Sequence, residues 1–177
     1  MPKRTPIKTW FSDTSIITDD SNQARELYNK SRYGIVENNK VKLSILEGLY
    51  LLEKERIVVY NKKNKEFTFD SLFRTSKKHD SDLNVRYPVF RDLRERGYIV
   101  KTALKFGADF RVYNRGIKPG EDHARWVVYA VHESQKQTWF DFAAKSRVAH
   151  STRKNLMIGI VDAEADVTYY EVEWIRP

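Results

Sequence analysis

Apolar residues recur along the chain with two different periods, and they predict alternating strands and helices. Short runs of β-branched and aromatic residues predict strands in the second half, at residues 98–102, 106–113, 124–133, 156–161 and 167–174. The run WVVYAVH within 124–133 is almost entirely apolar. A strand of this kind is typical of the centre of a sheet, because a central strand is buried on both faces.

The clearest helical spacing lies between residues 80 and 96. Its apolar positions are separated by four, three and three residues, at Leu83, Tyr87, Phe90 and Leu93. This spacing predicts a helix with one buried face, despite Pro88, that ends at Gly97. A second helix is expected from the cap Thr138 to about residue 149.

The first half of the chain has a less regular pattern. Strands are expected at residues 14–18 and 33–37, with a helix over 22–30 that Asp20 or Ser21 caps. Apolar positions spaced by four, four and three predict a helix over residues 41–54, at Val41, Ile45, Leu49 and Leu52. Residues 57–60 and 66–69 flank the basic sequence NKKNK and predict a hairpin, whose lysines we interpret as solvated.

A basic polar stretch near residues 78–81 separates the two patterned blocks. We therefore expect two domains, an N-terminal α/β domain over residues 1–79 and a C-terminal domain over 80–177. The fold class is predicted as α/β (α+β), with a central mixed sheet flanked by helices in the C-terminal domain.

Charge and composition narrow the classes of partner. The formal net charge is +8 and the pI is about 9.5, which favours a polyanionic partner, although a charge-rich solvated surface would give the same values. The absence of cysteine excludes disulfides, thiol catalysis and thiolate zinc sites. No apolar run approaches the ~18 residues that cross a bilayer, so a cytoplasmic protein is expected.

Candidate chemistry lies around residues 106–132. Tyr113 ends a predicted strand, and a Gly/Pro-rich loop separates it from His123. Lys154 follows in the sequence STRKN, just before a buried strand. Each has an ordinary interpretation, as an edge-strand aromatic, a loop histidine and a surface lysine. Together, without a recognised metal-ligand spacing, they suggest acid–base cleavage of RNA with no cofactor.

The segments FGADFRVYNRG, EDHARWVVYAV, STRKNLMIGIVD and DVTYYEVEW resemble the archaeal tRNA-splicing endonuclease family. The similarity extends over about residues 98–174 and, in layout, over the N-terminal block. It implies a nuclease-like C-terminal domain and metal-independent cleavage of precursor tRNA at a bulge–helix–bulge. The products would carry 2′,3′-cyclic phosphate and 5′-hydroxyl ends. Chains of this length in the family usually assemble as homotetramers.

The resemblance also assigns roles to residues. Tyr113 matches the general base, His123 the general acid and Lys154 the cation that stabilises charge on phosphorus. Arg147 matches a position that grips an unpaired base. Three further groups are candidates: Trp174 as its partner, Arg125 as a phosphate contact, and a subunit-docking loop formed by Asp162, Glu164 and Asp166.

Three alternatives stay open at this point. The chain could be a non-catalytic subunit that positions RNA, or a plain basic RNA-binding module that does not cleave. It could also be a magnesium-dependent nuclease that uses Asp141, Glu171 and Glu173, although these side chains also suit a solvated helix face and strand ends. The three predicted catalytic residues favour the splicing endonuclease, because a structural subunit has no chemical need for all of them.

Overall fold

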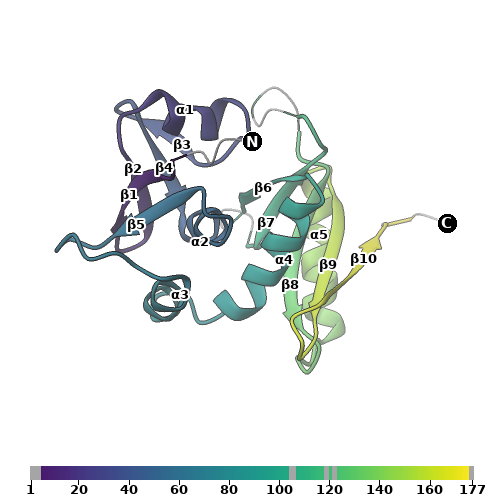
Figure 1. Cartoon of the computed structure of the whole chain (residues 1–177). Coiled ribbons are helices and arrows are strands. Elements are labelled where there is room, and N and C mark those ends of the chain that lie inside the picture. Colours follow the sequence, from purple (N-terminus) through teal and green to yellow (C-terminus); the bar gives the residue numbers. More distant parts are fainter. Residues whose placement is uncertain (1–4, 104–106, 118–119, 121–122, 176–177) are drawn as a thin grey trace. The chain divides into compact units, whose positions relative to one another are not determined.

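The computed structural model describes residues 5–103, 107–117, 120 and 123–175 of the chain (Figure 1). The chain forms two compact units that divide between Leu83 and Asn84. The α+β class expected from the sequence is confirmed, and the mixed sheet expected in the C-terminal domain is accompanied by a second mixed sheet in the N-terminal unit. Among the described residues, no helix is long and apolar enough to cross a membrane.

The N-terminal unit is built on a five-stranded mixed sheet with the order β3-β4-β2-β1-β5. Its strands are β1 (Ile7–Ser12), β2 (Ser15–Thr18), β3 (Ile35–Glu37), β4 (Lys40–Ser44) and β5 (Ile57–Tyr60). Its helices are α1 (Asn22–Asn29), α2 (Ile45–Glu53) and α3 (Phe69–Lys77). Strands β1 and β5 are parallel, and the other pairs are antiparallel. The expected cap Ser21 accepts a hydrogen bond from the backbone of Ala24 at the start of α1.

The helix expected over residues 41–54 is wrong in its first part, which is strand β4. Val41 and Leu43 are buried and alternate with half-exposed neighbours, as a strand requires. Ser44 then caps α2, and Glu47 completes a capping box with it. A spacing of four residues, as from Val41 to Ile45, suits both a strand and a helix. The pattern therefore did not reveal where β4 ends and α2 begins.

The predicted hairpin around NKKNK is present only in part. Strand β5 matches the expected range, but its partner segment contributes a single bridge, between Tyr60 and Glu66. The expected second strand over 66–69 is wrong at its end, because Thr68 caps α3 and Phe69 begins that helix. The hydroxyl of Thr68 accepts from the backbone of Ser71, which fixes the chain in a helical start.

The C-terminal unit holds a second five-stranded sheet with the order β10-β9-β8-β7-β6. Its strands are β6 (Ile99–Thr102), β7 (Phe110–Tyr113), β8 (Trp126–His132), β9 (Asn155–Val161) and β10 (Val167–Val172). Only β8 and β9 are parallel, and helix α5 (Trp139–Ser151) connects them. Strand β8 lies at the centre, as predicted. The strand expected over 106–113 is shorter and begins at Phe110; residue 106 lies outside the described residues.

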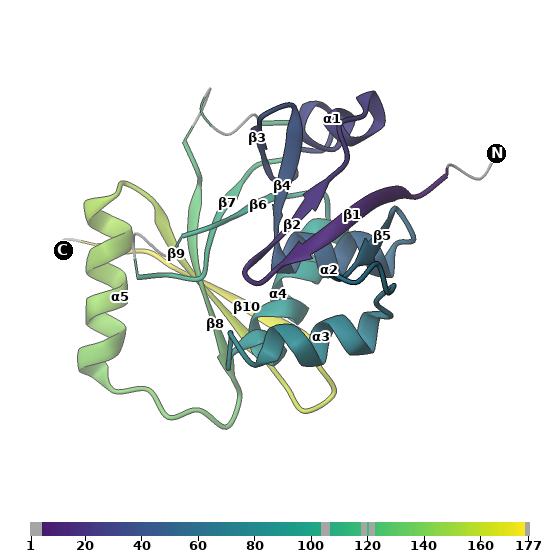
Figure 2. The same ribbon diagram turned by 90° about the vertical axis from the view of Figure 1, so that its left-hand side faces the viewer.

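Helix α4 (Leu83–Glu95) covers one face of this sheet and α5 covers the other (Figure 2). The predicted stripe on α4 is buried, with Leu83, Tyr87, Phe90 and Leu93 between 0% and 5% exposed. Gly97 ends the turn after α4 with a φ of 88°, as its position predicted. On the opposite face, Val127, Tyr129 and Leu156 pack with Ala149 of α5.

Candidate active site

Three strand ends meet at one edge of the C-terminal sheet. Strand β7 ends there at Tyr113, and β8 and β9 begin there, because β8 is antiparallel to β7 and parallel to β9. The ladder continues past the strands: the Arg125 amide donates to the carbonyl of Val112 at 2.9 Å, and the Asn155 amide donates to the carbonyl of Arg125 at 3.0 Å. Tyr113, His123 and Lys154, which the sequence suggested as catalytic, therefore reach this edge from neighbouring strands. We call it the catalytic edge.

Tyr113 is held in a small apolar cluster. It lies opposite Ile99 in the β6–β7 ladder and packs with Ala124 and the half-buried Ile117. Only 5% of the residue is exposed in the isolated chain. The aromatic ring is therefore fixed by packing, and β7 is an internal strand, so Tyr113 is not the edge-strand aromatic of the ordinary interpretation.

His123 lies three residues before β8 and is exposed. The next residue, Ala124, is 4% exposed and anchors the segment in the same cluster as Tyr113. This anchoring places a solvent-accessible imidazole beside the end of β7. An exposed histidine can exchange protons with solvent and approach a large substrate.

Lys154 is half-buried at the junction between α5 and β9. Its ammonium donates a hydrogen bond to the carbonyl of Thr152 at 2.8 Å, in the turn that follows the helix. Burial lowers the pKa of Lys154 from its ordinary value, and the neighbouring Arg111 guanidinium lowers that pKa further. The second influence shows that two cations lie close together at the catalytic edge.

Arg111 was not identified from the sequence. It lies on β7 two residues before Tyr113, so both side chains project from the same face of the sheet. The alternation in FRVY carried this signal, because a strand that presents Tyr113 to one face must present Arg111 to that face too. Its guanidinium adds positive charge where a phosphodiester would bind.

A pocket of about 270 Å³ adjoins Lys154. Its walls come from the end of α5, the start of β9 and the segment after β10, and they include His150, Arg153, Lys154, Asn155 and Trp174. The rings of His150 and Trp174 lie 4.2 Å apart between centroids. Trp174 is 53% exposed, so one side of its indole remains accessible. His150 was absent from the RNA-binding residues that the sequence suggested.

The two arginines of the predicted RNA-binding set are both exposed but lie in different surroundings. Arg147 lies on α5 three residues before His150, so the two share one side of the helix. Arg125 lies next to the catalytic edge, and its guanidinium carbon is 4.4 Å from the centroid of the Trp126 ring. The aromatic ring holds this cation at the surface.

The acidic turn between β9 and β10 is shaped by one of its own carboxylates. Asp162 accepts hydrogen bonds from the amides of Glu164 and Asp166 at 3.0 and 2.8 Å. Ala165 has a φ of 66°, which completes the tight reversal. Glu164 and Asp166 are exposed on the turn, whereas Asp162 is half-buried.

The carboxylates proposed for a metal-dependent nuclease have other contacts. Asp141 caps α5 together with Thr138, and hydrogen bonds from Thr138 lower the pKa of Asp141. Glu171 accepts a hydrogen bond from the side chain of Asn155, which lowers its pKa, and Arg125 adds to this effect. Across the described ranges, no three His, Asp or Glu side chains gather as ligands for a metal ion.

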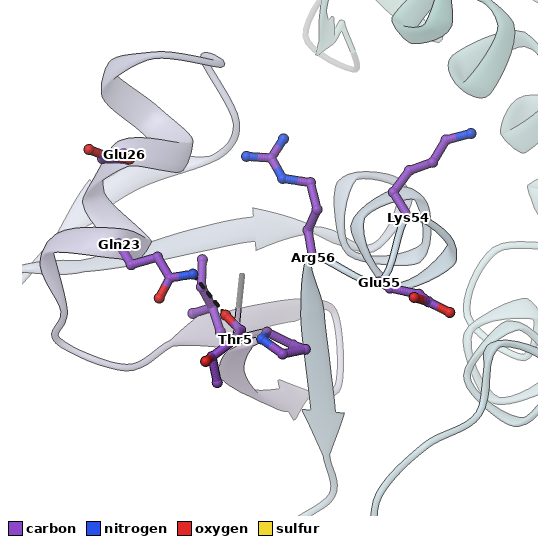
Figure 3. A pocket seen from close by; sticks show the side chains of 8 residues that line it. Thr5, Gln23, Glu26, Lys54, Glu55 and Arg56 are labelled. Atoms are coloured by element: carbon purple, nitrogen blue, oxygen red, sulfur yellow. Dashed lines mark hydrogen bonds between the residues drawn. The ribbon is translucent and has the colours of Figure 1, made fainter. Parts of the chain in front are cut away.

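A larger pocket, of about 590 Å³, lies in the N-terminal unit (Figure 3). Lys54 and Arg56 line it together with Glu26 and Glu55, so its formal charges balance. Gln23 donates a hydrogen bond to the Thr5 carbonyl on one wall. None of the residues that the sequence suggested for catalysis or RNA binding lines this pocket.

Two family models and several relatives match this chain, and the matches cover almost its whole length. Residues 83–169 match the sequence model of the tRNA intron endonuclease catalytic C-terminal domain, and residues 7–73 match that of the N-terminal domain. The tRNA-splicing endonuclease of Pyrococcus horikoshii is 41% identical over 171 residues, which are 97% of this chain and 98% of that protein.

Relatives from other archaea have similar identities. The tRNA-splicing endonuclease of Methanothermobacter thermautotrophicus is 40% identical over 154 residues, 87% of this chain and 89% of that protein. That of Methanococcus vannielii is 39% identical over 175 residues, 99% of this chain and 97% of that protein. Both domains of this chain therefore have counterparts in proteins of one kind.

Proposed function

This chain belongs to the tRNA intron endonuclease family, and we propose that Tyr113, His123 and Lys154 carry out its cleavage of precursor tRNA. The enzyme is an RNA endonuclease that acts in tRNA splicing. The observation that carries the assignment of residues is the convergence of β7, β8 and β9 at the catalytic edge. It supplies a hydroxyl, an imidazole and an ammonium at adjacent strand ends.

The reaction is a transesterification at each boundary of the intron within a bulge–helix–bulge. The 2′-hydroxyl loses its proton and its oxygen attacks the adjacent phosphorus. The bond from phosphorus to the 5′-oxygen breaks, and that oxygen takes up a proton. The products are a 2′,3′-cyclic phosphate and a 5′-hydroxyl, and neither water nor a metal ion is consumed.

Tyr113 takes the proton from the 2′-hydroxyl or orients that hydroxyl for attack. A neutral phenol is a weak base, so removal of the proton by Tyr113 would require a changed environment for its hydroxyl. Orienting the 2′-hydroxyl requires no such change. The burial of Tyr113 against Ile99 and Ala124 supports precise placement of its oxygen.

His123 acts as the general acid for the 5′-oxygen. Histidine is the side chain that most often serves as a general acid or base, because its imidazole can both bind and release a proton. Its exposure at the catalytic edge supports this assignment, because the leaving group belongs to a bulky helical substrate.

Lys154 stabilises the negative charge that develops on the phosphate oxygens. Its half-buried ammonium already has one fixed hydrogen bond, to Thr152, and so requires little reorganisation. Arg111 lies near enough to depress the pKa of Lys154, and we assign it a supporting electrostatic role toward the same phosphate.

RNA is held beside this edge by aromatic and cationic side chains. Trp174 and Arg147 grip an unpaired bulge base, and the His150 ring packs against Trp174 at an interplanar angle of 55°. Arg125 contacts a backbone phosphate, and its stacking on Trp126 supports that role by holding the guanidinium at the surface.

The active assembly is a homotetramer of this chain in the cytoplasm. Two features support it: β10 is an edge strand with exposed Tyr170, and the acidic turn beside it presents Glu164 and Asp166. An unpaired edge can join a second copy through backbone hydrogen bonds. The acidic turn can dock on a basic surface of another subunit.

The decisive experiment is cleavage of a bulge–helix–bulge RNA in EDTA by the wild-type chain and by His123→Ala. We expect cuts in both bulges with cyclic-phosphate ends, slowed about 10²–10⁴-fold in the variant because the leaving group loses its acid. His132→Ala is the matched control and should cleave at the wild-type rate.

Two outcomes would redirect the assignment. Cleavage that requires added magnesium would restore the carboxylate nuclease. Tight binding of RNA without cleavage in either buffer would indicate an RNA-positioning subunit that needs a catalytic partner.

A further inference from the structure

The N-terminal sheet has one buried face and one that stays open to solvent. Buried residues alternate along its strands, at Ile7, Thr9, Ile16, Thr18, Val41, Leu43, Ile57 and Val59. Helix α2 packs against this buried face, where Gly48 approaches Ile16. The intervening residues project from the other face and, apart from the buried Ser15, are exposed or half-buried. We call this the open face; it comprises Lys8, Trp10, Ile17, Lys42, Val58 and Tyr60.

The register of the strands aligns the open face into a row. Trp10 lies opposite Ile17 on one side and opposite Tyr60 on the other. Ile17 in turn lies opposite Lys42. Neighbouring strands are spaced by about 4.8 Å, so the side chains of Trp10 and Tyr60 leave the same face of the sheet at adjacent positions. Trp10 is 37% exposed, which leaves part of its indole accessible.

Positive charge surrounds these aromatic rings. Lys8 precedes Trp10 by two residues on the same face, and Lys42 lies two strands away in the same row. Directly after Tyr60, the tight turn 61–65 exposes three lysines, Lys62, Lys63 and Lys65. The side chain of Asn61 accepts hydrogen bonds from the amides of Lys63 and Lys65 at 2.8 and 2.9 Å, which fixes the turn.

Three carboxylates lie near these lysines, and one of them, the exposed Glu66, follows Lys65 and lies opposite Tyr60. Lys62 pairs with Asp13, and Lys42 pairs with Glu37, each at 3.4 Å. The paired side chains are 43–77% exposed, and ion pairs at that exposure are weak. A phosphate can therefore replace the carboxylate as partner at little cost. The patch keeps an excess of positive charge, because Lys8, Lys42, Lys62, Lys63 and Lys65 outnumber the carboxylates of Asp13, Glu37 and Glu66.

We propose that the open face and the basic turn 61–65 bind unpaired nucleotides of the precursor RNA that lie away from the cleaved bulges. Bases stack on Trp10 and Tyr60, while the lysines contact phosphates. The proposal rests on the proposed function, because it takes the RNA substrate from it, but it adds a second surface in the other unit. Stacking on an aromatic side chain changes affinity by about 5- to 150-fold per base.

The test compares two RNAs, a minimal bulge–helix–bulge duplex and a full-length intron-containing precursor. We expect Trp10→Ser/Tyr60→Ser to weaken binding of the precursor about tenfold or more. Single-turnover cleavage of the minimal duplex should stay at the wild-type rate, because that RNA has no unpaired nucleotides outside its two bulges. Tyr28→Ser is the matched control, since Tyr28 lies on α1 in the same unit and is 38% exposed.

A second variant avoids any change within the sheet. Replacing Lys62, Lys63 and Lys65 with alanine alters only exposed turn residues, so folding should be preserved. We expect this variant to bind the precursor more weakly and to reduce the slope of log Kd against log salt by about two.

Unchanged precursor binding in both variants would overturn the proposal. A smaller particle mass by light scattering, with RNA affinity intact, would also overturn it, because the open face would then be a contact between protein chains. Failure of the wild-type chain to cleave the minimal duplex would count against the proposed function instead, and binding of the precursor would still be measured separately.

Discussion

At the scale of single residues, the catalytic edge places a cation where the fold itself does not favour one. Burial and Arg111 both lower the pKa of Lys154, which means that its charged form is disfavoured in the folded chain. This penalty is fully present below the lowered pKa, declines as the pH rises above it, and is gone above the ordinary value of 10.5. The proposed role of Lys154, which needs the ammonium, would account for a lysine at this position.

We therefore expect Lys154→Met to separate activity from stability. Methionine fills similar space without a charge, so cleavage should fall by about 10²–10³-fold while the midpoint of thermal unfolding stays level or rises by about 1–3 °C at pH 7. Single-turnover cleavage and calorimetry measure the two effects. Lys145→Met on α5 is the control, and a parallel loss of stability in Lys154→Met would refute the argument.

The same lowered pKa predicts an alkaline limit to the reaction. Cleavage needs the protonated amine, so the rate should decline as the pH rises toward and through the lowered pKa of Lys154, beginning below the ordinary value of 10.5. In Lys154→Arg the guanidinium stays charged over this range, so the decline should move to higher pH. A decline at the same pH in both proteins would assign it to another group.

Most of the candidate site could be predicted from the sequence, because the sequence segments around its residues resemble those of a known family. Tyr113, His123 and Lys154 were selected in this way, and the structure brings their strand ends to one edge. Arg111 was missed although the alternation in FRVY places it on the same face as Tyr113. His150 was missed because its relevance depends on a contact with Trp174 that no spacing along the chain reveals.

At the scale of elements, β4 and α2 show that hydrophobic periodicity alone does not locate the boundary between a strand and a helix. The apolar positions from Val41 to Leu52 suit one continuous helix, yet the chain changes from strand to helix at Ser44. The capping box of Ser44 and Glu47 was visible in the sequence and marked the true start. The second half was predicted more closely, because long apolar runs such as WVVYAVH are unambiguous.

The close approach of α2 to β2 gives a prediction at this scale. A methyl group added at Gly48 would overlap the Cδ1 atom of Ile16 on the buried face of the sheet. We expect Gly48→Ala to lower the free energy of unfolding by about 1–3 kcal/mol, despite the better helix propensity of alanine. Urea denaturation would measure the loss.

A double variant checks that mechanism. Ile16→Val removes the Cδ1 atom and alone should cost about 0.5–1.5 kcal/mol. In the pair Gly48→Ala/Ile16→Val, the valine leaves room for the new methyl group, so the combined loss should be smaller than the sum of the single losses. Strict additivity would show that the two residues do not compete for space.

At the scale of the whole molecule, the chain carries a net charge of +8 but concentrates acidic residues in the turn between β9 and β10. Because Asp162 shapes this turn from within, Glu164 and Asp166 are the carboxylates available to another subunit. Their charge, more than the turn itself, should determine docking.

Reversing that charge should therefore change the assembly. We expect Glu164→Lys/Asp166→Lys to convert tetramers into dimers in sedimentation experiments and to lower cleavage about tenfold or more, while the fold of the chain is kept. Glu95→Lys, a charge reversal on α4, is the control. A tetramer of unchanged mass in the double variant would exclude the acidic turn as a docking element.

The order in which β7, β8 and β9 pair also determines when the folding chain can gain its activity. Tyr113 and His123 are ten residues apart, on the two sides of one antiparallel connection, whereas Lys154 joins them only after the chain has formed α5 and returned as a parallel strand. Parallel pairing closes a longer loop and is slower to form than a local antiparallel pair. During folding, the chain can thus hold the proposed acid and base in place before the proposed cation arrives. We expect it to become able to cut RNA only when β9 docks beside β8.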